Sequence, residues 1–253
     1  MRARLPKTFF GYSTNDLIRL GRDGDGGYLV SKSDVYSSKF LITFGVGDDW
    51  SFEEDFISIN DVPIFAYDAS VNNAYFFKKF ILSIFKISRP RIAIHWLKTI
   101  ISYNRFFSKK NVRHIQKFVG IDTLDGVYCT FEEVVKDLYV EEKIFVKIDI
   151  EGSEYRLLDE LVQYQDKLSG LVIEFHDLDL HLNTVESFIQ NFDLSLVHVH
   201  ANNGSPIRKK DSLPLVIELT FSQSRQHFEE FILPHRLDQA NDKNLPEIEL
   251  IFE

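Results

Sequence analysis

Several ionisable side chains follow an apolar stretch of the chain at the point where a strand is expected to end. Residues Ile144–Ile148 are apolar apart from Lys147, and Asp149, Glu151 and Glu154 come directly after them. The carboxyl ends of parallel strands form the edge of an α/β sheet at which ligands bind. Asp149 is therefore a candidate for acid–base chemistry, whereas the two glutamates are placed to stabilise the first turn of a following helix.

A second group of ionisable side chains lies at the end of the apolar stretch Leu171–Phe175. It consists of Glu174, His176 and Asp177. If the two stretches form neighbouring strands, these side chains lie beside Asp149. A carboxylate and an imidazole in this position can act as a general base or hold a divalent ion. We therefore predict that Asp149 and His176 are catalytic residues.

A pair of histidines marks a later strand. His198 and His200 fall on one face of the expected strand Leu194–His200, and Asn203 follows it. A lone histidine is more often structural. For a pair at this spacing, a role in acceptor binding, metal ligation or proton transfer is as good an interpretation as a structural role. We predict a catalytic role for His200, which is nearer the strand end, and substrate binding for His198 and Asn203.

A glycine turn follows the expected strand Leu41–Phe44. Gly45 and Gly47 allow the backbone to approach a ligand closely, and Asp68 ends the next strand. An acid at this distance can accept hydrogen bonds from ribose hydroxyls, although it can also be a simple turn residue. Trp50 occupies the position where a dinucleotide-binding turn needs a small residue, which disfavours a nicotinamide or flavin cofactor.

Near the N-terminus, Asp25, Gly26, Gly27 and Tyr28 form a further glycine-rich segment. Asp-Gly pairs are typical of hairpin turns, and that interpretation is as good as a binding role. We predict that the first three residues contact a cofactor and that Tyr28 contacts a substrate.

The order of apolar stretches predicts one α/β domain over residues 1–253. Strands alternate with helices, which is typical of a largely parallel sheet with helices on both faces, and the last two strands are expected to pair antiparallel. The seven expected strands are Leu41–Phe44, Val62–Tyr67, His114–Val119, Ile144–Ile148, Leu171–Phe175, Leu194–His200 and Leu215–Phe221. The expected helices include Ser153–Leu168, and an insert at about residues 74–110 separates the second and third strands.

Charge and cysteine content limit the classes of function. The net charge of −9 argues against nucleic acid as a partner, because nucleic-acid binding needs a positive surface. Cys129 is the only cysteine, so no internal disulfide is expected, and no apolar run is long enough to span a membrane. We expect a cytoplasmic protein, with the inner face of the membrane as the alternative location.

The insert departs from the acidic character of the chain. From Ala74 to Lys110 there are nine Lys or Arg residues and no Asp or Glu, interleaved with aromatic residues. Such a segment can form a lid over an anionic, sugar or lipid-linked acceptor, an amphipathic surface that rests on an acidic membrane, or a helical pair with a solvated basic face.

Taken together, these motifs resemble the FkbM-type methyltransferases, a family with the class I S-adenosylmethionine-dependent fold. The resemblance extends from about residue 19 to 221, and Val146–Glu154 is its most specific part. The other matching segments are Asp25–Tyr28, Phe44–Glu53, Tyr67–Asp68, Ile173–His176 and His198–Asn203.

The resemblance implies a Rossmann-like three-layer fold in which the last of seven strands is inserted antiparallel. It implies S-adenosylmethionine as cofactor, with Gly45 and Gly47 near its methionine part and Asp68 near its ribose. Some methyltransferases of this fold also use Mg²⁺ or another divalent cation, which here implies Asp149, Glu174 and Asp177 as ligands, although the intervening histidine departs from that pattern.

The function that we predict is therefore O-methylation of a sugar hydroxyl in a glycan or glycoconjugate, free or lipid-linked. Two alternatives remain at this point. One is a catalytically inactive protein that keeps the fold and binds an adenosine-containing ligand. The other is a nucleotide-sugar-modifying enzyme such as a glycosyltransferase.

Overall fold

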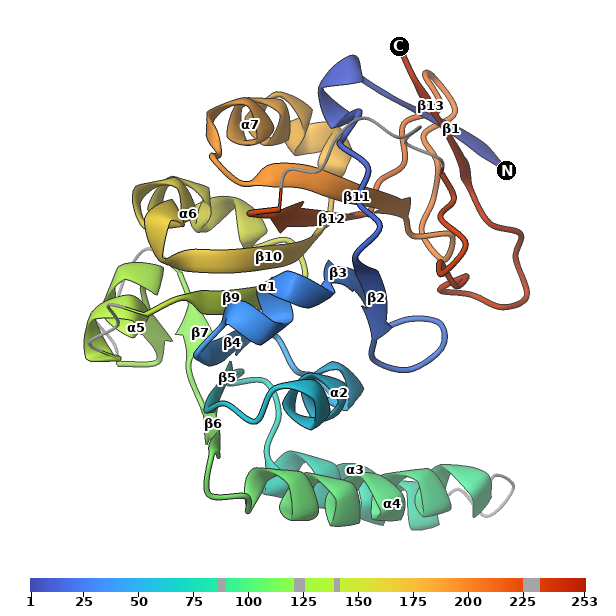
Figure 1. The fold of residues 1–253 in the computed structure, drawn as a ribbon. Coiled ribbons are helices and arrows are strands. Elements are labelled where there is room, and N and C mark those ends of the chain that lie inside the picture. The colour runs from blue at the N-terminus through green and yellow to red at the C-terminus, as the bar shows by residue number, and fades with distance from the viewer. Residues whose placement is uncertain (86–89, 121–125, 139–141, 225–232) are drawn as a thin grey trace.

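The computed structural model describes residues 1–85, 90–120, 126–138, 142–224 and 233–253. At its centre is a seven-stranded sheet with the order β11-β12-β10-β9-β4-β5-β6 (Figure 1). All neighbours pair in parallel except β12, which is antiparallel to both β10 and β11. The strands are β4 (Phe40–Phe44), β5 (Ile64–Tyr67), β6 (Val112–Ile115), β9 (Ile144–Ile148), β10 (Leu168–Phe175), β11 (Ser195–Ala201) and β12 (Ile217–Ser222). The expected α/β fold with an inserted antiparallel last strand is confirmed.

Both faces of the sheet are apolar, and each face is covered by helices. Ile42 and Phe44 point into one core, whereas Leu41 on the same strand points into the other. The first core is closed by α5 (Phe131–Asp137), α6 (Leu158–Gln163) and α7 (Leu178–Asn191), and the second by α1 (Lys32–Ser37) and α2 (Ser51–Ile59). Continuous apolar strands of this kind are typical of a sheet buried on both sides.

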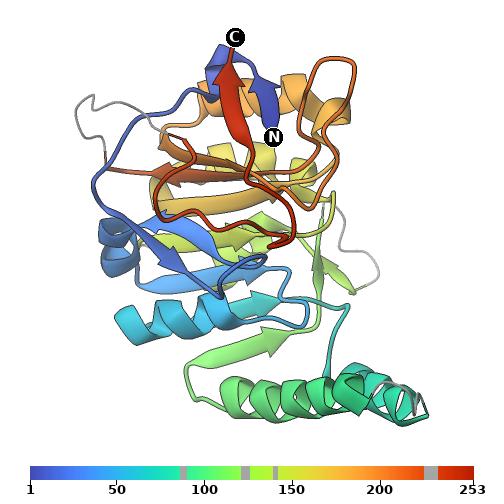
Figure 2. The same ribbon diagram turned by 90° about the vertical axis from the view of Figure 1, so that its right-hand side faces the viewer.

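The insert forms two helices, α3 (Asn73–Ile84) and α4 (Pro90–Phe107). Phe76 of α3 and Tyr103 of α4 both pack against Trp50, the residue immediately before α2. The insert is therefore attached to the second core through aromatic contacts. Figures 1 and 2 show the two helices as the outermost layer at one end of the molecule.

Small additional sheets lie outside the central one. β1 (Arg2–Leu5) pairs in parallel with β13 (Glu249–Phe252), which brings the two ends of the chain together. β2 (Leu17–Leu20) and β3 (Tyr28–Ser31) form an antiparallel hairpin, so the hairpin interpretation of the glycine-rich segment is confirmed. β7 (Phe118–Val119) and β8 (Tyr128–Cys129) form the third pair.

Two expected elements differ from the structure. The single helix expected over Ser153–Leu168 is divided into a 3-10 turn at Glu154–Arg156, the helix α6 and a second 3-10 turn at Gln165–Lys167. The reason is that the Glu154 carboxylate accepts hydrogen bonds from the backbone N–H of Ile150 and Gly152 and holds a turn in place of the helix start. The third strand, expected to reach residue 119, ends at Ile115.

Candidate functional site

A cavity of about 530 Å³ lies at the carboxyl ends of β4, β5 and β9. The turn after β4 contributes Gly45 and Gly47, β5 contributes Asp68, and β9 contributes Asp149. Asp25 and Gly26, from the loop between β2 and β3, also line it. The structure thus gathers most of the predicted cofactor-binding residues around one cavity.

The glycine turn is required by close backbone packing. Gly45 has a φ of +81°, and a Cβ at this position would lie 1.6 Å from the carbonyl oxygen of Asp149. Only glycine fits there, since any side chain would separate the ends of β4 and β9. Gly47 has a φ of +57°, but a Cβ added to it would meet no atom within 4 Å.

Asp68 holds this turn in place. Its Oδ2 accepts hydrogen bonds from the backbone N–H of Val46 and Gly47, at 3.0 and 2.9 Å, and its Oδ1 accepts two from Ser70. Burial raises the pKa of Asp68, but these hydrogen bonds outweigh it and lower the pKa overall. Because all four lone pairs of the carboxylate are in use, a contact with ribose would have to replace one of these bonds.

A second, smaller cavity of about 400 Å³ adjoins the first. The two share Asp25, Asp149 and Glu151. The described lining of the smaller cavity also includes the amides of Asn202 and Asn241, and it contains no lysine or arginine. A ligand in either cavity would therefore reach Asp149.

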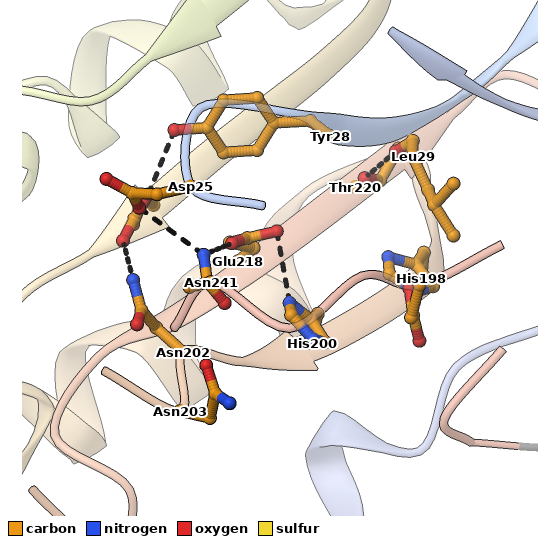
Figure 3. Close-up of polar contacts among 12 residues, drawn as sticks. Asp25, Tyr28, Leu29, His198, His200, Asn202, Asn203, Glu218, Thr220 and Asn241 are labelled. Carbon is orange, nitrogen blue, oxygen red and sulfur yellow. Dashed lines mark hydrogen bonds and ion pairs between the residues drawn. The ribbon is translucent and has the colours of Figure 1, made fainter. Parts of the chain in front are cut away.

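Asp149 belongs to a hydrogen-bonded cluster with Tyr28, Glu174 and Asn202. The Tyr28 phenol lies 3.0 Å from Asp149 Oδ2 and 2.9 Å from Glu174 Oε2, and Asn202 donates to Glu174 Oε1 at 3.0 Å. Burial raises the pKa of Asp149, and burial together with the charges of Glu218 and Asp149 raises the pKa of Glu174 to about 8. In Figure 3, Tyr28 lies above and Asn202 below, and a marked contact begins at each of them.

His176 lies at the rim of the same cluster. Its Nδ1 is 3.1 Å from the buried carboxylate of Glu154, and its Nε2 is 3.5 Å from Glu151. Burial lowers the pKa of His176, but the hydrogen bond to Glu154 and the neighbouring negative charges raise it to about 9. Without a bound cation the imidazole is then protonated at neutral pH, so its charge favours Asp149 over His176 as a proton acceptor.

The residues that could hold a metal differ from the predicted set. Asp149, Glu151 and His176 each offer a ligand atom, and these atoms lie within 4.8 Å of one another. Glu174 is engaged by Tyr28 and Asn202. Asp177 is exposed and precedes α7 with a φ of +50°.

His198, His200 and Asn203 are buried and are not among the described residues that line either cavity. His198 pairs with Asp238 at 2.9 Å, and Asn203 donates to the backbone carbonyls of Asp242 and Leu245. In Figure 3, His198 lies on the far side of His200 from Asn202. These contacts fasten the C-terminal segment to β11.

His200 stands in a row of charged residues across three strands. It is opposite Glu218 on β12, and Glu218 is opposite Glu174 on β10. The ring lies 3.3 Å from Glu218 and 3.2 Å from Glu247. Burial lowers the pKa of His200, but these carboxylates outweigh it and raise the pKa well above its usual value. His200 is thus held between two carboxylates, and its catalytic role stays a prediction.

Other residues at the site were not expected from the sequence. Lys147 lines the larger cavity although its side chain is mostly buried, and its ammonium group lies 3.8 Å from Glu53 and 5.4 Å from the centre of the Tyr28 ring. A lysine inside an apolar strand was the available signal.

Gly27, which was predicted to contact a cofactor, is not among the described residues that line either cavity. It allows close backbone packing in the hairpin, since a Cβ there would lie 2.3 Å from the Arg22 carbonyl oxygen.

No family model matches the chain, and no curated protein matches it in sequence. Solved structures with a related arrangement include a precorrin-6y C5,15-methyltransferase from Geobacter metallireducens, 13% identical, covering 76% of this chain and 86% of that one at a TM-score of 0.40. An rRNA methylase from Streptococcus thermophilus is 13% identical and covers 76% and 94% at 0.38. A putative tRNA (m1A22) methyltransferase from Streptococcus pneumoniae, in complex with S-adenosyl-L-methionine, is 11% identical and covers 78% and 72% at 0.38.

One expectation is revised after these comparisons. The exclusion of nucleic acid as a partner is not sustained, because the matched structures include enzymes named as rRNA and tRNA methylases. The FkbM-type assignment stays a resemblance in sequence motifs. None of the described helices is long and apolar enough to cross a membrane. The strand order and the antiparallel β12 give the chain a Rossmann-like α/β fold.

Proposed function

We propose that the protein is an S-adenosylmethionine-dependent methyltransferase that methylates a hydroxyl group of a sugar. The observation that carries the proposal is that the two cavities meet at Asp25, Asp149 and Glu151. A donor in the larger cavity and an acceptor in the smaller one would both reach Asp149. Methyl transfer requires such a meeting point, because the two reactants must be held together in line.

The larger cavity fits S-adenosylmethionine in size and charge. Its volume of about 530 Å³ is ordinary for a small-molecule site. Its described lining carries six carboxylates and four cationic side chains, and an excess of negative charge favours a sulfonium cation. Gly45 and Gly47 would lie along the methionine part of the ligand, and Asp68 would lie beside its ribose.

The reaction that we propose needs one proton acceptor. S-adenosylmethionine, when bound, supplies an electrophilic methyl group on a positively charged sulfur. The acceptor oxygen bonds to the methyl carbon as the carbon–sulfur bond breaks, and the hydroxyl proton must leave. Asp149 is suited to take this proton because it lines both cavities and because burial raises its pKa. Tyr28 fixes the orientation of the Asp149 carboxylate.

The lining of the smaller cavity supports an uncharged acceptor rich in hydroxyl groups. Amides and carboxylates donate to and accept from sugar hydroxyls. The diphosphate of a nucleotide sugar would instead meet an excess of negatively charged carboxylates. His176 is the only side chain in the described lining that can carry a positive charge. The lining therefore supports sugar methylation over glycosyl transfer.

A divalent cation is a further part of the proposal. Asp149, Glu151 and His176 combine carboxylate oxygens with an imidazole nitrogen, a donor set that suits Mn²⁺ or Zn²⁺ better than Mg²⁺. The hydrogen bond between His176 Nδ1 and the Glu154 carboxylate fixes the orientation of the ring, as carboxylates behind metal-binding histidines do. Such an ion would orient the oxygens of the acceptor.

Calorimetric titration with S-adenosylmethionine tests the donor site. The informative variant is Gly47→Leu, and its matched control is Gly126→Leu. Both glycines have a positive φ, and an added Cβ would meet no atom within 4 Å at either, but only Gly47 is among the described residues lining the cavity. We expect binding by the wild type and the control and loss of binding by Gly47→Leu. A wild type that does not bind would exclude the methyltransferase function.

Formation of S-adenosylhomocysteine with a panel of monosaccharides and glycans tests the transfer step. We expect turnover with at least one of them, and Asp149→Asn should keep donor affinity while losing most of the turnover. Donor binding without turnover on any hydroxyl compound would instead support the inactive adenosine-ligand-binding alternative.

A further inference from the structure

The outer surface of the insert exposes an unusual amount of apolar area. Eight of the sixteen large hydrophobic side chains that are exposed in the described chain belong to α3, to α4 or to the residue after α3. We call this surface the hairpin face. Its apolar members are Phe77, Ile81, Leu82, Ile84, Phe85, Ile94, Leu97 and Ile101.

The apolar side chains of α4 form a stripe on the side of the helix that points away from the protein. Ile94, Leu97 and Ile101 recur at intervals of three and four residues, which places them on one helix face. Tyr103 and Phe106 of the same helix are buried in the second core. The helix therefore has two apolar faces, and only one of them is covered by protein.

Positive charge accompanies the stripe. Residues 69–121 contain no Asp or Glu, in a chain whose net charge is −9. Arg91, Lys98 and Arg105 recur every seven residues along α4, and the last two each follow an exposed isoleucine by four residues. Arg105 lies 3.6 Å from Glu54 but keeps 73% of its side chain exposed.

We propose that the hairpin face docks the protein onto an anionic lipid bilayer. Transfer of exposed aliphatic side chains into the acyl boundary is favourable, and flanking lysine and arginine side chains add electrostatic attraction to anionic headgroups. The face lies at the end of the molecule opposite β1 and β13, so a flat surface can reach it (Figures 1 and 2). The proposed contact is interfacial, with only the exposed side chains of the hairpin face entering the bilayer.

Charge and side-chain type argue against two other partners for the hairpin face, namely a second copy of the protein and single-stranded nucleic acid. A symmetric dimer through this face would set the same positive charges against each other, with no acid in residues 69–121 to neutralise them. Single-stranded nucleic acid would use cations and stacked aromatic rings. It would leave Ile94, Leu97 and Ile101 in water. The docking inference is independent of methyl transfer.

Vesicle co-sedimentation of the full chain tests the proposal. We expect binding to vesicles that contain phosphatidylglycerol, weaker binding to pure phosphatidylcholine, and weakening by salt through screening. The double variant Leu97→Gln/Ile101→Gln removes the apolar contribution, and Arg91→Glu/Lys98→Glu reverses the charge. Each should lower binding to anionic vesicles by about tenfold or more. The control Leu180→Gln removes a leucine on α7 that is more exposed than Leu97 or Ile101, and it should leave binding unchanged.

Three results would overturn the proposal. The first is unchanged vesicle binding by both double variants, each verified as folded by its thermal transition. The second is absence of binding to anionic vesicles together with a dimer in light scattering that the apolar double variant abolishes. The third is absence of vesicle binding together with tight binding of a uridine oligonucleotide, which would assign the same face to RNA.

Discussion

Tyr28 and Glu174 are 146 positions apart in the sequence, and their side-chain oxygens lie 2.9 Å apart in the folded protein. The same phenol is 3.0 Å from Asp149. A phenol has one proton and cannot donate to both carboxyl groups at once. The contacts are satisfied when Glu174 is protonated and donates to the phenol oxygen while the phenol donates to Asp149. The pKa of about 8 for Glu174, which is caused mainly by burial, agrees with this arrangement.

Replacing Tyr28 with phenylalanine should destabilise the protein by about 1–3 kcal/mol, because it leaves two buried carboxyl groups without their shared partner. Urea unfolding measures the change. Tyr36→Phe is the matched control, since Tyr36 is 56% exposed and we expect a change within about 0.5 kcal/mol. Equal stability of the two variants would show that the shared hydrogen bonds contribute nothing.

Glu174 should make the stability of the protein depend on pH. Its pKa rises from an ordinary value of 4.5 to about 8 on folding, so the folded state binds the extra proton more tightly. Its stabilising contribution is complete below pH 4.5 and is lost as the pH rises towards 8, with a slope of at most about 1.4 kcal/mol per pH unit. Asp34, whose pKa burial raises to about 7, acts in the same direction.

The measurement is urea unfolding of wild type and Glu174→Gln at a series of pH values between 4.5 and 8. The variant should show a shallower decline, because its amide has no proton to lose. Glu142→Gln replaces an exposed glutamate and should follow the wild type. Parallel curves for wild type and Glu174→Gln would contradict the assignment of this decline to Glu174.

The central sheet could be predicted because its strands are apolar on both faces. Ile144–Ile148, for example, has all five residues buried, and only a sheet covered on both sides buries such a run. The pairing of β1 with β13 could not be predicted in this way. These strands are four residues long and only partly buried, and their pairing depends on contacts between the two ends of the chain.

The candidate site was predictable where it depends on neighbouring strand ends. Asp149 directly follows β9, and Glu174 lies near the carboxyl end of β10. The two strands pair in parallel, so the contact between these side chains follows from the strand positions. The place of His200 depends on strand order instead. Because β12 lies between β10 and β11, Glu218 stands between Glu174 and His200 and takes the contact that would otherwise reach the cluster. Only the resemblance implied this insertion, because spacing along the chain does not reveal it.

Replacing His200 with glutamine should therefore affect stability and leave donor binding intact. The substitution leaves the buried Glu218 and the half-buried Glu247 without their positive partner, and breaking a buried pair costs about 3–5 kcal/mol. Adding Glu218→Gln to His200→Gln should restore part of the lost stability. A double-mutant cycle in urea unfolding measures this recovery. Loss of S-adenosylmethionine affinity at unchanged stability would instead assign His200 to the binding site.

Titration with Mn²⁺ separates the two sets of candidate metal ligands. The atoms of Asp149, Glu151 and His176 lie within 4.8 Å of one another, so this group can hold an ion without movement of the strands. Wild type should bind Mn²⁺ in calorimetry, and His176→Gln should weaken binding by about tenfold or more because it removes a ligand. Asp177→Asn alters an exposed residue outside the group and should leave the affinity unchanged. If Asp177→Asn weakens binding while His176→Gln does not, the ion is held by the set that the sequence suggested.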